Sequence, residues 1–217
     1  MFSLAVLSSF VEQSEPVFLY QDCANTLSIG DIFKKYNQGG GQMPVVKQWW
    51  VEGAVKVHIP DDFSLILEPK ANGTGYTSVQ AKLKDGSIVK GKFSIKKAPP
   101  PSIHFLNKGK FVKDTLDFDT YANELLVIKL SPDQDFRELL PRDARYKLQD
   151  AKLVISKDGK EVFSESLQKY QLDLSTLNLE KGSTLEIRFD KVLRRNYRDE
   201  VYLVTNMPNK PYHIHFK

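Results

Sequence analysis

The residues best placed for metal chemistry are two histidines near the C-terminus, His213 and His215. Side chains two residues apart in a strand share a face, so both imidazoles would point the same way at a spacing that suits a divalent metal. A third ligand would have to come from another strand. The alternative is that Tyr212, Ile214 and Phe216 face the core and the histidines face solvent. We favour this alternative, so the sequence predicts no metal site.

Two groups of aspartates offer the oxygen ligands that calcium prefers. Their spacing matches no EF-hand loop, and aspartate is common in turns because its carboxylate accepts hydrogen bonds from nearby backbone N–H groups. We therefore expect backbone capping rather than calcium binding, and we predict no cofactor. The groups are Asp114, Asp117 and Asp119, and Asp133 and Asp135.

Residues for covalent catalysis form no recognisable pattern in this sequence. It contains no G-x-S-x-G nucleophile elbow, and its histidines show no fixed spacing from a serine or cysteine. The single cysteine, Cys23, excludes an intrachain disulfide and a cysteine-based zinc cluster. Its apolar surroundings favour a small buried side chain in a strand over a functional thiol. We therefore predict that the protein is not an enzyme.

The residues best suited to bind another protein include the adjacent pair Trp49 and Trp50. Adjacent side chains of a strand face opposite sides, so both are buried only where both faces are covered. Either one tryptophan belongs to the core while the other is exposed or at an interface, or a loop covers both. The glycine-rich segment 36–44, just upstream, is a candidate binding loop.

A second candidate is the basic stretch 190–200, which contains Arg194, Arg195 and Tyr197. We expect a charged loop between two strands that pairs with its own acidic residues. Its arginines and tyrosine would serve as a docking rim, because both residue types are favoured at binding hot spots. The net charge of +4 is small and evenly scattered, which argues against nucleic acid as the partner. The predicted partner is therefore another protein.

The segments that must position these residues are nearly all strand-like. Apolar residues alternate with polar ones, as a half-buried strand requires, and the Asp-Gly dipeptides at 85–86 and 158–159 predict two β-hairpins. Only 27–36 and 135–140 have the pattern of brief helical turns. The sequence therefore predicts an all-β fold. The clearest alternating segments are 54–59, 79–83, 151–155, 185–189 and 212–216.

Three consecutive prolines at 99–101 divide the chain. Each proline fixes φ and lacks a backbone donor, so none can lie inside a sheet. The run forms a stiff, extended connector. We predict two Ig-like β-sandwich domains, residues 16–98 and 103–217, joined by a proline-rich linker at 99–102. The alternative is a single large sandwich with an extended crossover.

Residues 1–15 are mostly apolar up to residue 11 and then become polar. This pattern is typical of a secretory signal peptide, here without the positively charged start, and the segment would be a remnant of one. The alternative is an N-terminal strand or a disordered tail. The stretch is too short to span a bilayer, and no other segment is a candidate. We expect a protein that is periplasmic or otherwise exported, with no direct membrane span.

Five motifs follow one another in order along residues 16–217. They are VFLYQDCANTLSI at 17–29, FSIKK at 93–97 before the prolines, DARY at 143–146, DGK at 158–160 and GSTLEI at 182–187. As an ordered set they resemble the two C-terminal periplasmic domains of GldM/PorM-type gliding motility and type IX secretion proteins.

The resemblance implies β-rich periplasmic domains that dimerise along a shaft between an inner-membrane motor and an outer-membrane-associated ring. The motifs match the distal end of that shaft only, so torque transmission is not expected of this chain. We predict a non-enzymatic, exported scaffold that binds proteins of the cell envelope; homodimerisation is implied by the resemblance alone. The alternative is a carbohydrate-binding or adhesion module, because exposed tryptophan and tyrosine side chains on a sandwich also stack on sugar rings.

Overall fold

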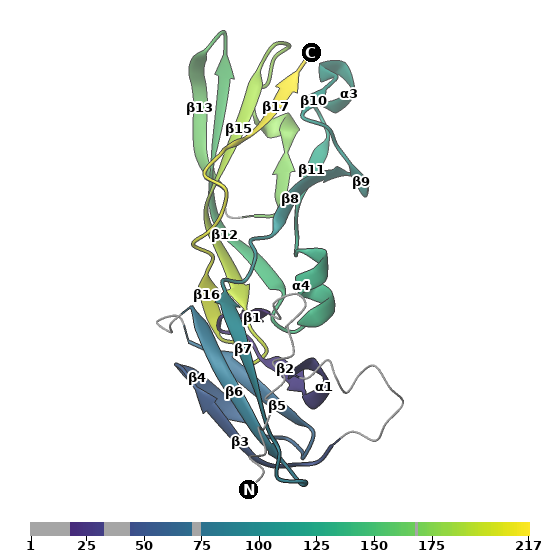
Figure 1. Cartoon of the computed structure of the whole chain (residues 1–217). Helices are drawn as coiled ribbons and strands as arrows, with labels where there is room; N and C mark the ends of the chain where they lie inside the picture. The colour runs from purple at the N-terminus through teal and green to yellow at the C-terminus, as the bar shows by residue number, and fades with distance from the viewer. Residues whose placement is uncertain (1–17, 33–43, 71–74, 168) are drawn as a thin grey trace, which may run out of the picture. The chain divides into compact units, whose positions relative to one another are not determined.

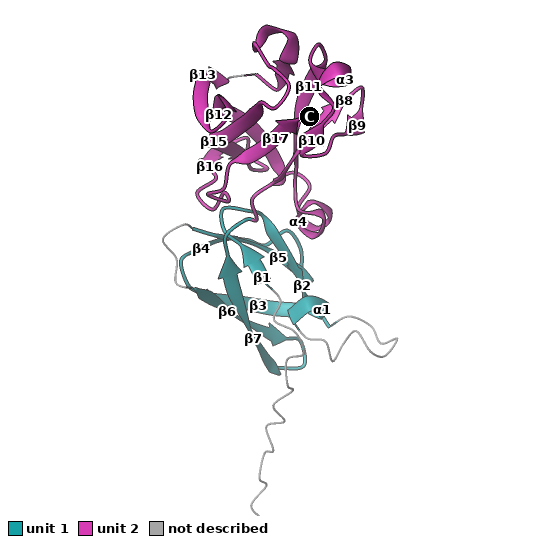
Figure 2. Cartoon of the chain, turned by 90° about the horizontal axis from the view of Figure 1, so that it is seen from above, with its two compact units in different colours: residues 1–98 teal, residues 99–217 magenta. Residues whose placement is uncertain are grey.

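The computed structural model describes residues 18–32, 44–70, 75–167 and 169–217, and most of them lie in β-strands (Figure 1). The predicted all-β class is therefore confirmed. The chain divides into two compact units, residues 1–98 and 99–217 (Figure 2). The expected signal segment 1–15 and residues 36–43 of the glycine-rich loop lie outside the described residues.

The boundary between the units falls beside the three prolines, which are held by the second unit. The hydroxyl of Tyr146 donates a hydrogen bond to the carbonyl of Pro99, and Pro101 is buried. Ser102 was expected in the linker. Instead it is the first residue of strand β8 (Ser102–Asn107) and pairs with Ser131. The strand thus begins one residue earlier than the sequence predicts.

The first unit consists of two sheets. The larger sheet has the strand order β1-β7-β6-β3, with β1 parallel to β7 and the other pairs antiparallel. The smaller sheet has the order β2-β5-β4 and is antiparallel, and helix α1 follows β2. The bounds are β1 Phe18–Tyr20, β2 Asn25–Ser28, α1 Ile29–Ile32, β3 Val46–Glu52, β4 Val55–His58, β5 Ser64–Pro69, β6 Tyr76–Leu83 and β7 Ile88–Lys96.

Both sheets of the first unit contribute to a shared core. Strand β6 alternates as expected, because Val79, Ala81 and Leu83 are buried while the residues between them are not. Strand β5 of the smaller sheet alternates in the same way. One cluster of buried side chains therefore joins the two sheets: Leu19, Leu27, Ile32, Leu65, Leu67, Val79 and Phe93.

A buried asparagine closes the turn between β1 and β2. The side-chain oxygen of Asn25 accepts a hydrogen bond from the N–H of Tyr20 at 2.6 Å. Its amide nitrogen donates to the carbonyls of Tyr20, Cys23 and Leu67 at 2.8, 3.0 and 3.1 Å. A buried amide with these partners fixes the turn against β5. Cys23 is buried, as predicted, but it lies in this turn rather than in a strand.

The second unit also consists of two sheets. The larger sheet has the order β10-β17-β15-β12-β13 with β16 added beside β15, and the smaller has the order β14-β11-β8-β9. Besides β8, the bounds are β9 Lys110–Phe111, β10 Thr115–Leu116, α3 Phe118–Tyr121, β11 Leu125–Ser131, α4 Gln134–Leu139, β12 Arg145–Lys157, β13 Lys160–Leu167, β14 Gln171–Asp173, the 3-10 turn η1 Leu174–Thr176, β15 Thr184–Arg195, β16 Val201–Leu203 and β17 Tyr212–Phe216.

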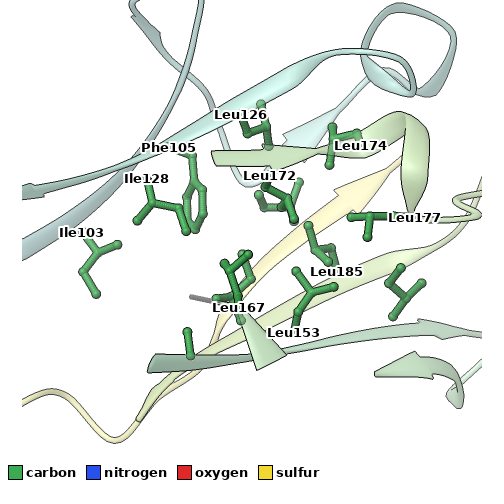
Figure 3. Close-up of a cluster of buried hydrophobic side chains, with 14 of the residues drawn as sticks. Ile103, Phe105, Leu126, Ile128, Leu153, Leu167, Leu172, Leu174, Leu177 and Leu185 are labelled. Carbon is green, nitrogen blue, oxygen red and sulfur yellow. The ribbon is translucent and has the colours of Figure 1, made fainter. Parts of the chain in front are cut away.

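The core of the second unit lies between its two sheets. Phe105 and Ile128 of the smaller sheet belong to the same buried cluster as Leu153 and Leu185 of the larger one, and Figure 3 shows these side chains between the strands. The inward-facing residues of the alternating segments 151–155 and 185–189 contribute to this cluster, as expected. At residues 212–216 the expectation is also confirmed, because Ile214 and Phe216 are buried while the two histidines are exposed.

The two expected hairpins are both present, and their turns differ. Asp158 and Gly159 both have positive φ, 51° and 74°, so β12 and β13 are joined by a tight two-residue turn. Of the Asp85-Gly86 pair only Gly86 has positive φ, 88°, in the longer turn from β6 to β7. A third hairpin, which the sequence did not predict, turns at Lys108-Gly109, where φ is 48° and 80°.

The two expected helical turns are confirmed as α1 and α4, while α3 was not expected. Ser28 and Asp31 cap α1. The N–H of Asp31 donates to the Ser28 hydroxyl at 3.1 Å, and the N–H of Ser28 donates to the Asp31 carboxylate at 2.7 Å. This reciprocal pair is a capping box, which compensates for the small size of the helix.

Gly91 on β7 lets the core of the first unit close, and this can be tested. A Cβ at this position would lie 2.9 Å from the ring of Phe93 and 3.1 Å from Ile32. Because Phe93 is fully buried, we expect Gly91→Ala to lower the free energy of unfolding by about 1–3 kcal/mol. Both tryptophans are in the first unit, so urea denaturation followed by tryptophan fluorescence reports on this unit.

Gly75→Ala is the matched control for this measurement. A Cβ at Gly75 meets no atom within 4 Å, so we expect a change of less than about 1 kcal/mol, in either direction. Equal effects of the two substitutions would show that the close approach at Gly91 does not limit the packing.

Candidate interaction surfaces

The tryptophan pair on β3 is divided between the core and the surface. Trp49 packs against both buried clusters of the first unit, and its indole Nε1 is buried with no hydrogen-bond partner among the described residues. The side chain of Trp50 is 38% exposed. It lies directly opposite Gln80 of β6, on the outer side of the larger sheet. Of the two tryptophans, Trp50 is thus the one available to a ligand.

Trp50 belongs to a sheet face that carries aromatic rings and ammonium groups, which we call the aromatic–lysine face. Directly paired residues share a face. Gln80 pairs with Trp50 on one side and with Lys90 on the other, while Tyr76 pairs with Ser94, which pairs with Phe18. The aromatic–lysine face is defined by Phe18, Trp50, Tyr76, Lys82, Lys90, Lys92 and Lys96.

Two of the lysines are held on this face by aromatic rings. The Nζ atom of Lys92 lies 3.8 Å from the centroid of the Tyr76 ring, and that of Lys96 lies 3.0 Å from the centroid of the Phe18 ring. Cation–π contacts at exposed sites are worth about 0.5–1 kcal/mol. They are strong enough to orient the ammonium groups but too weak to prevent them from turning towards a bound anion.

The basic stretch of the second unit is not the surface loop that the sequence predicts. Strand β15 continues to Arg195, so the loop begins only at Asn196. Arg194 is buried, and so is Asp143. The Nη1 atom of Arg194 lies 3.3 Å from the Asp143 carbonyl and 4.0 Å from its carboxylate. Arg194 is therefore part of the interior. Its burial depends on a residue far away in the sequence.

Arg195 and Tyr197, the other two predicted rim residues, lie at the surface of this turn. Arg195 is exposed and shares the carboxylate of Asp199 with Arg145, at N–O distances of 3.8 and 2.9 Å. Tyr197 is half-buried. Its backbone N–H donates to the Asp143 carboxylate at 3.2 Å, and its ring lies 5.1 Å from the Arg198 guanidinium. Both side chains are thus tied into the turn itself.

The turn between β15 and β16 is organised by a buried asparagine, as is the turn in the first unit. The side-chain oxygen of Asn196 accepts from the N–H groups of Arg198 and Glu200 at 2.9 and 3.0 Å. Its amide nitrogen donates to the Glu200 carboxylate at 2.8 Å. Most of the charged groups of this stretch therefore stabilise the turn, which leaves few of them for a partner.

A second exposed face, which the sequence did not predict, lies on the smaller sheet of the second unit. Val127 of β11 pairs with Leu106 of β8, which pairs with Phe111 of β9, and Leu125 lies two residues from Val127 on the same side. Phe111 is 65% exposed and Leu125 is 42% exposed. We call these four side chains the outer apolar patch. The uninterrupted apolar run at residues 125–128 could have indicated this patch. A strand with one solvent-exposed face normally alternates apolar and polar residues, and this strand does not.

The histidine pair and two of the aspartates take the structural roles that the sequence favours. The rings of His213 and His215 stack on an exposed face with centroids 6.3 Å apart. The part of the chain that the structure describes contains no group of three or more metal-ligating side chains. Asp133 caps α4 and Asp117 caps α3. The Thr120 hydroxyl and backbone N–H donate to Asp117 and hold the pKa of that carboxyl below its usual value.

The comparisons with known proteins give no family for this chain. No protein-family model matches it, and no curated protein matches it either. In the described residues, no helix is long and apolar enough to cross a membrane. The resemblance to GldM/PorM-type proteins therefore stays a prediction based on the sequence motifs.

The burial of Arg194 predicts that it stabilises the second unit. Arg194→Ala leaves the Asp143 carboxylate buried without its cation, and we expect the free energy of unfolding to fall by about 3–5 kcal/mol. Urea denaturation followed by circular dichroism measures this. Tryptophan fluorescence on the same samples follows the first unit, because both tryptophans lie there, and we expect its transition to stay in place.

Arg195→Ala is the control at the neighbouring position. Arg195 is exposed and forms an ion pair with the exposed Asp199, so its loss should change stability by less than about 0.5 kcal/mol. If Arg194→Ala lowers the free energy of unfolding as little as Arg195→Ala does, the structural role assigned to Arg194 is wrong, and Arg194 would again be a candidate for binding a partner.

Proposed function

We propose that this protein is a non-enzymatic, exported scaffold that binds another protein of the cell envelope, and that its units are two Ig-like β-sandwiches joined by a proline-rich linker. Two features support the architecture. In each unit, two sheets share one buried cluster, and the boundary between the units lies at the prolines. The apolar segment at residues 2–11 supports export.

The observation that carries the proposed function is the outer apolar patch. Contiguous apolar patches on the surface of soluble proteins often mark sites of protein–protein interaction. Phe111 and Leu125 supply the exposed apolar area, and an interface core is typically aromatic or aliphatic. Polar residues border the patch as an interface rim would: His104, Lys129, Gln171 and Asp173.

The order of the sequence motifs supports a setting in the bacterial envelope. By the resemblance described above, the partner would be a component of the type IX secretion and gliding apparatus, and the chain would correspond to the distal periplasmic part of GldM/PorM-type proteins. Homodimerisation follows from the same resemblance alone. The basic turn at residues 195–200 would then be at most a minor contributor, because its charges are already paired within the turn.

The proposed docking site can be tested by substituting Phe111. Because Phe111 is 65% exposed, Phe111→Asp should leave the fold intact while placing a charge in the apolar interface, where it would lack a partner. We expect crosslinking in living cells, followed by affinity capture from native envelopes and mass spectrometry, to recover type IX secretion components with the wild type. With Phe111→Asp or Leu125→Asp we expect at least a ten-fold loss of recovery.

Val162→Asp is the matched control for this experiment. Val162 is 60% exposed and lies on β13, at the edge of the other sheet of the same unit. Its substitution adds the same charge away from the patch, so capture should be unchanged. Capture that survives both patch substitutions, or that Val162→Asp reduces equally, would contradict the assignment of the patch as the docking site.

A further inference from the structure

We propose that the aromatic–lysine face of the first unit binds an acidic polysaccharide, with the indole of Trp50 as the stacking platform. This site lies on a different unit from the outer apolar patch, and it takes a ligand of a different chemical class. Neither site depends on the other, so the two can be tested separately.

The side chains around Trp50 are suited to bind a carbohydrate. Its nearest neighbours on the face are polar: Gln80 lies directly opposite, and Gln48 and Glu52 lie two residues away on β3. Directly opposite side chains in a sheet are about 5 Å apart, and those two residues along a strand are about 7 Å apart. Long amide side chains therefore lie within reach of anything stacked on the indole, and they both donate and accept hydrogen bonds.

These neighbours fit a sugar better than a protein. A tryptophan that anchors a protein interface is typically surrounded by contacts that exclude water. The neighbours of Trp50 are solvated instead, and they match the many hydroxyl groups of a carbohydrate. The flat indole can take the C–H face of a sugar ring, while the amides bind the hydroxyl groups at the edge of that ring.

The charge of the aromatic–lysine face favours an acidic ligand. The face carries four lysines, Lys82, Lys90, Lys92 and Lys96, against the single carboxylate of Glu52. An isolated excess of positive charge attracts carboxylate or sulfate groups and loses this attraction as salt is added. The charge therefore selects an acidic polysaccharide over a neutral one.

The arrangement of the lysines indicates a polymer rather than a small anion. Lys90, Lys92 and Lys96 are all exposed along the outer side of a single strand, β7. Lys90 and Lys92 are two residues apart, or about 7 Å, and Lys96 lies about 14 Å further along. A row of this kind cannot converge on one ion, but it can follow an extended chain that carries repeated charges.

The aromatic rings argue against single-stranded nucleic acid. Such ligands are held by stacking successive bases on several free rings. On this face the Tyr76 and Phe18 rings each lie beneath a lysine ammonium. These two rings therefore hold cations and are not available to stack on bases. One exposed indole beside a row of cations suits a chain that is mostly hydroxyl groups and charge.

Titration with polysaccharides of defined charge tests the proposal on the intact protein. Sodium alginate, a polyuronate, is the acidic probe, neutral dextran of similar length is the uncharged probe, and oligothymidylate is the nucleic-acid probe. We expect isothermal titration calorimetry, a readout that does not depend on Trp50, to give saturable binding of alginate, an affinity that falls steeply with salt, and no saturable binding of dextran. Trp50→Ala should weaken alginate binding at least ten-fold, with Trp50→Phe in between.

Paired lysine substitutions keep the test valid if Trp50→Ala fails to fold. Lys90→Gln with Lys92→Gln should weaken alginate binding at least ten-fold and flatten its salt dependence. Lys147→Gln with Lys152→Gln removes two exposed lysines from β12 of the second unit and should change nothing. If the two pairs of substitutions weaken binding equally, alginate is attracted only by the overall positive charge of the protein, and the proposed site is wrong.

Three other results would also overturn the proposal. The first is no binding of alginate by the wild type. The second is equal affinity for dextran, which would remove the role of the lysines. The third is tighter, Trp50-dependent binding of oligothymidylate, which would assign the face to nucleic acid. None of these results would affect the outer apolar patch, whose test uses protein capture.

Discussion

The two-residue period of the strands, packed around a core that two sheets share, is the constraint on which the rest of the structure depends. Each strand gives one side to the core and leaves the other side free. On β6, Val79 and Ala81 face inward, so Gln80 is held outward at a set position. The register with β3 then places Trp50 opposite it. The same register that builds the core therefore also fixes the chemistry of the outer face.

Much of the fold could be predicted because this period is a local signal. The Asp158-Gly159 hairpin and the strands at 151–155 and 185–189 follow from alternation and turn residues alone. The parallel pairing of Phe18 with Ser94 could not be predicted in this way. That contact joins distant segments, and it depends on the whole core rather than on any short pattern.

The candidate sites show the same difference between what a local pattern predicts and what depends on distant contacts. The opposite placement of Trp49 and Trp50 follows from strand geometry, but which of them is exposed depends on which side of β3 meets the smaller sheet. The burial of Arg194 is a clearer case. Within its own segment it is one basic residue among several, and its carboxylate partner Asp143 lies in the turn before β12. Only the pairing of Tyr146 with Arg194 brings that turn beside it.

The two proposed binding surfaces would obey different physical rules. The outer apolar patch would gain free energy by removing water from Phe111 and Leu125 when a partner binds, a contribution that salt does not screen. The aromatic–lysine face would gain from solvated charges, which salt screens within about 10 Å at 0.1 M. Because each surface is the outer side of a sheet with its own core, a change in Trp50 or Phe111 would alter one proposed binding property while the other unit keeps its fold. Ionic strength would therefore shift the balance between the two kinds of binding without any change in conformation.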